Sequence, residues 1–88
     1  MKPLSHKEHK RALILRLKRI EGQLRGVQRL IEEEAPCESV AQQLSASRRA
    51  LDKAYHAMVG CLLESHLTGK GVAHTDVQPV VDMLSRYG

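Results

Sequence analysis

The sequence predicts an all-α protein, and its composition and its apolar pattern both support that prediction. The 88 residues include two tyrosines but no phenylalanine and no tryptophan, so the core must be built from aliphatic side chains. Such side chains suit helices packed on helices better than a β-sandwich or a barrel. Apolar residues also recur at alternating steps of four and three positions through two long segments, which is typical of helices that pack in bundles.

The length predicts one domain, residues 1–88. A domain of this size is near the lower limit at which one hydrophobic core suffices, so we expect an oligomer. We find no apolar run long enough to span a membrane and no signal peptide. The two cysteines do not have the spacing of a disulfide framework. These features predict a cytoplasmic protein with reduced thiols that does not bind membranes.

The first predicted helix covers about residues 6–33. Ser5 and Glu8 have the spacing of a capping box, which favours a helix start at this point. The apolar positions form one packing seam along the helix: Leu13, Leu17, Ile20, Leu24, Val27 and Ile31.

Positive charge is concentrated in this first segment. Up to Arg29 the chain carries nine Lys or Arg residues and two Glu residues. Five of the basic residues fall within ~40° of one another, nearly opposite the apolar seam, at about 100° per residue. Side chains of like charge on one stripe repel each other, so the stripe favours binding to nucleic-acid phosphates. Its members are Lys7, Arg11, Lys18, Arg25 and Arg29.

The second predicted helix covers about residues 37–67. Three glutamates, followed by Ala35 and Pro36, end the first helix, and proline suits the first turn of the next one. Its seam again steps by four and three, through Val40, Leu44, Ser47, Leu51, Ala54, Met58, Cys61 and Ser65. Cys61 is therefore expected to be a buried packing residue.

A glycine-containing linker is predicted at residues 68–75, followed by a short third helix at about residues 76–86. Thr75 and Gln78 have the spacing of a second capping box. No helix-turn-helix or zinc-finger spacing occurs in the chain.

Cys37 and His66 point to a site that needs two copies of the chain. They are 29 residues apart in one predicted helix, which places them within ~20° of the same face but roughly 43 Å apart along the axis. An ion cannot bridge that distance, but an antiparallel partner helix would bring Cys37 of one chain beside His66 of the other. Leu62 also lies within ~20° of this face.

Several segments together resemble the CsoR/RcnR family of bacterial repressors: residues 16–33 (RLKRIEGQLRGVQRLIEE), Cys37, residues 42–48 and residues 64–66. The resemblance covers about residues 5–67. It implies a three-helix protomer, an antiparallel four-helix-bundle dimer and a disc-shaped tetramer. It also implies that basic helix faces bind double-stranded operator DNA and that an inducer bound at the dimer interface releases it.

The resemblance assigns residues to both sites. The family's ligand cysteine corresponds to Cys37, its next two ligand positions to Leu62 and His66, and its N-terminal histidine to a position near His6. The basic residues associated with DNA correspond to Arg16 and Lys53, with Lys18, Arg19, Arg48 and Arg49 nearby.

The inducer is left open by the leucine at the middle ligand position. One thiolate and one imidazole remain, and His6 or His9 could add a third ligand, so the expected inducer is a transition-metal ion: Ni, Co, Zn or Cu. The alternative is covalent modification of Cys37 by a persulfide or an electrophile. Cys61 lies ~120° around the helix from Cys37 and so off the face at which a second sensing cysteine would be needed. A third interpretation is a helical protein that coats nucleic acid without sensing.

We do not predict an enzyme. One chain offers no adjacent Cys/His pair, no oxyanion loop and little room for a pocket.

Overall fold

The computed structural model describes residues 3–67 and 74–88, without the side chains of residues 66–67 and 74–76. It contains α1 (Lys7–Glu32), α2 (Cys37–Leu67) and α3 (His74–Tyr87). No strand occurs in the described part of the chain, and the all-α prediction is confirmed. The predicted linker lies mostly in residues 68–73, outside the described residues.

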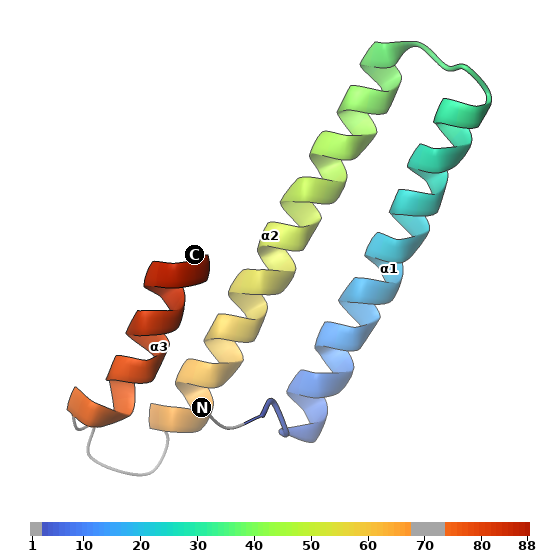
Figure 1. Ribbon diagram of the computed structural model, residues 1–88. Helices are drawn as coiled ribbons and strands as arrows, with labels where there is room; N and C mark the ends of the chain where they lie inside the picture. Colours follow the sequence, from blue (N-terminus) through green and yellow to red (C-terminus); the bar gives the residue numbers. More distant parts are fainter. Residues whose placement is uncertain (1–2, 68–73) are drawn as a thin grey trace.

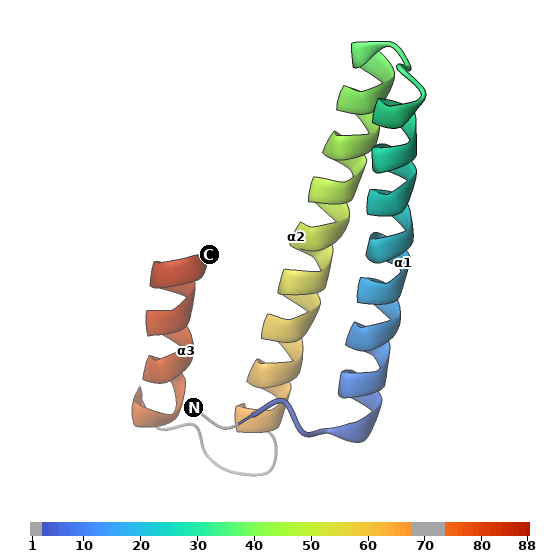
Figure 2. The same ribbon diagram turned by 45° about the vertical axis from the view of Figure 1, so that its right-hand side comes forward.

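The three helices form one layer. α1 and α2 make a long antiparallel hairpin, and α3 lies beside the C-terminal half of α2, on the side away from α1 (Figure 1). The order of the helices is the same after a 45° turn (Figure 2). Residues 3–6 run from the start of α1 toward the C-terminal end of α2.

Both predicted capping boxes are wrong. The N-cap of α1 is His6, whose side chain makes no capping hydrogen bond. Ser5 precedes the N-cap by one residue. Its hydroxyl is therefore not placed to accept a hydrogen bond from the backbone amides of the first helical turn, as an N-cap side chain would. α3 begins at His74, so Thr75 lies inside the helix and not before it.

The turn between α1 and α2 uses the residues that the sequence marked as a break. Glu34 has a left-handed backbone with φ 56°, and the Ala35 amide donates to the Leu30 carbonyl at 2.9 Å. This bond closes a loop of six residues, which is typical of a helix that ends in a left-handed residue. The Pro36 carbonyl accepts from the Ser39 amide at 2.9 Å, so α2 starts directly after the proline.

The apolar seam predicted along each of the two long helices is divided between two surfaces, one buried between α1 and α2 and one exposed. Every seventh residue is buried between α1 and α2: Ile20 and Val27 are 5% and 4% exposed, and Ser47 and Ala54 are 2% and 3% exposed. The buried Ser47 hydroxyl donates to the Gln43 carbonyl at 2.9 Å, so its polar group is satisfied. The alternate positions are 37–58% exposed, namely Leu17, Leu24 and Ile31 in α1 and Leu44 and Leu51 in α2.

These five exposed residues lie on one face of the hairpin, which we call the apolar face. In each helix they are rotated by about 40–60° in the same sense from the buried seam. Because α1 and α2 are antiparallel and share that seam, the same rotation brings both sets to the same side.

The dimensions agree with a chain that does not close its own core. The radius of gyration is 17.1 Å and the extents are 55 × 26 × 14 Å. A compact domain of this length would have a radius of gyration of about 12 Å, and the smallest extent is close to the diameter of one helix. α3 closes only part of the surface, where Val80 is 1% exposed and Val59 and Leu62 of α2 are buried.

Candidate functional site

Cys37 is placed by the turn that starts α2. It is the first residue of the helix, and its thiol is free and exposed. The thiol lies in an open, mainly aliphatic groove of about 380 Å³, lined by Ile31, Ala35, Cys37, Val40, Ala41 and Leu44. An exposed cysteine in such a groove is available both to a metal ion and to a reactive small molecule.

His66 lies at the opposite end of the same helix. It belongs to the last turn of α2, which is 31 residues long, and its side chain is outside the described part of the structure. The predicted separation along one unbroken helix is therefore retained. Cys37 and His66 of one chain cannot meet, because α2 holds them at its two ends (Figure 1).

The middle ligand position does not contribute to this surface. Leu62 is 6% exposed and lies on the part of α2 next to α3. Cys61 is half-buried and free, and its phase is that of Ser47 and Ala54, which face α1. The structure therefore does not bring Cys61 to Cys37.

Two histidines and a glutamate meet where the start of α1 is beside the end of α2. The rings of His6 and His9 have centroids 4.3 Å apart with an interplanar angle of 33°, and His9 Nε2 is 3.2 Å from Glu64 Oε2. Sequence reasoning did not pair His9 with Glu64. The available signal was the phase of His9, which continues the line of Ile20 and Val27 that faces α2.

The described side chains of one protomer do not form a metal site. No group of three His, Cys, Asp or Glu residues in the described part of the chain could hold an ion. A site built from three such side chains would therefore need a second protomer or side chains outside the described part of the chain.

The candidate DNA-binding residues fall on three surfaces. By helical phase, Arg16 and Arg19 of α1 and Arg49 and Lys53 of α2 lie on the side of the hairpin opposite the apolar face. We call this surface the basic face. All four residues are exposed, and Arg49 donates to the Ser45 hydroxyl at 3.2 Å.

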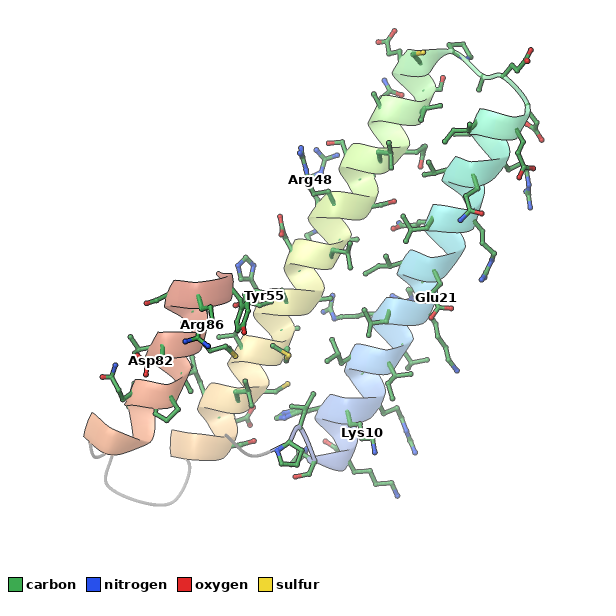
Figure 3. The ribbon with its side chains drawn as sticks, in the orientation of Figure 1. Lys10, Glu21, Arg48, Tyr55, Asp82 and Arg86 are labelled. Atoms are coloured by element: carbon green, nitrogen blue, oxygen red, sulfur yellow. The ribbon has the colours of Figure 1, made fainter. Side chains whose placement is uncertain are left out.

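The other two candidates lie elsewhere. Lys18 belongs to the predicted basic stripe along the outer edge of α1, nearly opposite the side that packs on α2. Arg48 projects from the side of α2 that faces away from α1 (Figure 3). Its helical phase is close to that of Cys37. The six predicted DNA-binding residues therefore do not form one continuous patch on one protomer.

No helix in the described part of the chain combines the length and the apolar character needed to cross a bilayer.

Comparison with known proteins agrees with this geometry. A sequence model of metal-sensitive transcriptional repressors matches residues 9–86. The copper-sensing transcriptional repressor CsoR of Bacillus subtilis is 41% identical over 97 aligned residues, which cover 98% of this chain and 90% of the relative. The copper-sensing repressor CsoR of Mycobacterium ulcerans is 36% identical over 80 residues, with 83% and 68% coverage.

A solved structure with the same fold is a variant of the formaldehyde-responsive regulator FrmR from Salmonella enterica serovar Typhimurium. The TM-score is 0.79 at 26% sequence identity, and the match covers 96% of this chain and 99% of that one. The chain thus belongs to the metal-sensitive transcriptional repressors, the CsoR/RcnR family that its sequence resembles. Its relatives are repressors and not enzymes, as predicted.

Proposed function

We propose that this protein is a cytoplasmic repressor that leaves its operator when a transition-metal ion binds between two protomers, through Cys37 of one and His66 of the other. The observation that carries this proposal is the placement of both residues on one face of α2, at its opposite ends. Two α2 helices packed antiparallel would form two such sites per dimer, and neither site would exist in a monomer.

The apolar face supports the dimer that this mechanism needs. Its five exposed aliphatic residues repeat every seven positions on both helices of the hairpin, and this spacing is that of helices packed against partner helices. A second copy related by a two-fold axis would cover the stripe and complete a four-helix bundle. The tetramer is proposed from the family resemblance alone.

The donor set favours borderline metals. A thiolate with one or two imidazoles suits Ni(II), Co(II) and Zn(II), whereas Cu(I) prefers more sulfur ligands. His6 is exposed and stacked on His9 at the end of the hairpin that carries His66, so it is the proposed third ligand. The named relatives are copper-sensing, so Cu(I) belongs in the test.

The direct test is titration of the reduced protein with Ni(II), Co(II), Zn(II) and Cu(I), followed by operator binding with and without each ion. The proposal requires tight binding of at least one ion and weaker operator binding in its presence. If no ion binds more tightly than micromolar, metal sensing is excluded.

Covalent modification of Cys37 is the second candidate. The exposed thiol in its aliphatic groove and the likeness to a formaldehyde-responsive regulator favour it. Here the intact mass of the protein would rise after exposure to a polysulfide, which transfers a sulfane sulfur to the thiol and leaves as a shorter polysulfide, or to formaldehyde, which adds to the thiol. Operator binding would be lost without any metal.

The basic face is the proposed DNA contact surface. If Arg16 and Lys53 touch phosphates, Arg16→Ala and Lys53→Ala should weaken operator binding and lower its dependence on salt by about one ion for each phosphate that is no longer neutralised. The measurement is fluorescence anisotropy across a salt series. Arg86→Ala, an exposed arginine on α3, is the control, and a slope that stays unchanged in all three variants would exclude this face.

Leu62 is proposed to limit metal affinity. Leu62→His would place an imidazole within about 20° of the face shared by Cys37 and His66 and should tighten metal binding at least roughly tenfold. Because Leu62 is 6% exposed, the free energy of unfolding should fall by about 2 kcal/mol or more. Leu63→His, one residue and about 100° away, should not raise metal affinity, and an equal gain in both variants would contradict this role.

A further inference from the structure

One side-chain pair connects the two helices of the hairpin at the end that carries His66. His9 is half-buried, with 22% of its side chain exposed, and its Nε2 atom is 3.2 Å from Glu64 Oε2. Its Nδ1 atom is buried and has no hydrogen-bond partner among the described residues. The described contacts therefore anchor the polar part of this ring to α2 through Glu64.

A histidine is unusual at this position. His9 has the phase of Ile20 and Val27, so an aliphatic side chain would continue the packing between α1 and α2 without leaving a buried nitrogen unsatisfied. The stacked His6 ring covers His9 and comes from the N-cap, where it makes no capping bond. Packing alone thus does not explain the pair.

The pair lies between the two proposed sites. Glu64 and His66 are both in the last turns of α2, at positions about 160° apart around the helix. On α1, His9 lies seven residues, about two turns, before Arg16 of the basic face and within about 20° of its phase. The contact between His9 and Glu64 therefore joins the end of α2 that carries His66 to the start of α1.

We propose that His9 and Glu64 are positioning residues that couple inducer binding at His66 to the DNA-binding surface of α1. This inference rests on the proposed function. Neither residue binds the inducer or the DNA. The pair determines by how much the inducer changes operator affinity, which is a coupling free energy between two sites.

The test is the ratio of the operator dissociation constants measured with and without Ni(II), Co(II), Zn(II) or Cu(I). Couplings of this kind are typically about 5- to 150-fold. In His9→Leu and Glu64→Ala the ratio should fall at least about fivefold, toward one, while metal affinity without DNA and operator affinity without metal stay within about twofold. His9→Gln, whose amide can still donate to Glu64, should keep the wild-type ratio.

Leucine suits the buried seam, so His9→Leu should fold at least as stably as the wild type, and thermal unfolding checks this. In the double variant the ratio should be no lower than in either single variant, because both changes remove the same interaction. Gln78→Ala, which removes the 2.7 Å bond to Asp82 within α3, is the control and should keep the wild-type ratio.

Three results would overturn the inference. A wild-type ratio in His9→Leu shows that the pair does not couple the sites. Weaker metal binding in His9→Gln shows that His9 is itself a ligand. If none of the four ions changes operator affinity in the wild type, the proposed function fails and this inference fails with it, whereas the first two results leave the proposed function intact.

Discussion

Cys37→Ala is expected to abolish the response to the inducer and to leave operator binding intact. Cys37 is the only thiol on the face shared with His66, and a metal site without it would keep imidazoles alone, so metal affinity should fall by about 100-fold or more. The side chain is exposed and free, so the free energy of unfolding should change by less than about 0.5 kcal/mol. The measurement is metal titration together with operator binding at saturating metal.

Cys61→Ala is the matched control for this experiment. Cys61 is also a free cysteine of α2, but its phase directs it toward α1, so its removal should leave metal affinity unchanged. Unaltered release of the operator by metal in Cys37→Ala would exclude the proposed metal site.

The helices could be predicted from the sequence because their apolar seams are long and regular. The predicted range of α2, residues 37–67, agrees with the structure, and α1 and α3 differ from their predicted ranges by at most two residues at either end. The capping boxes could not be predicted from spacing alone. Ser5 and Glu8 have the right spacing, but the helix start also depends on the packing of His6 and His9 at the end of the hairpin.

The candidate sites could be predicted only in part, for a geometrical reason. Phase along one helix places Cys37 and His66 on a common face, because both residues belong to α2. The pair of His9 and Glu64, 3.2 Å apart, depends on how α1 and α2 are aligned, and no pattern within one helix contains that alignment. For the same reason the sequence did not separate Arg16 and Lys53, which lie on the basic face by helical phase, from Arg48, which projects from the side of α2 away from α1 (Figure 3).

The largest effect on assembly is expected from Leu51→Glu. Leu51 is 46% exposed in one chain and lies in the middle of the apolar face, where the proposed two-fold dimer would bury it. A carboxylate there would lose its hydration without a partner, which costs several kcal/mol for each copy. We therefore expect a monomer in sedimentation equilibrium and at least roughly 100-fold weaker operator binding, because a single protomer would then hold the operator in place of two.

Leu15→Glu separates this effect from the mere addition of charge. Leu15 is 52% exposed, nearly the same fraction as Leu51, but its phase places it on the opposite side of the hairpin, among the residues of the basic face. Its substitution should leave the oligomeric state unchanged and weaken operator binding through charge alone. If Leu51→Glu remained as oligomeric as Leu15→Glu, the apolar face would not be the dimer interface. Cys37 and His66 would then lack the partner chain that brings them together.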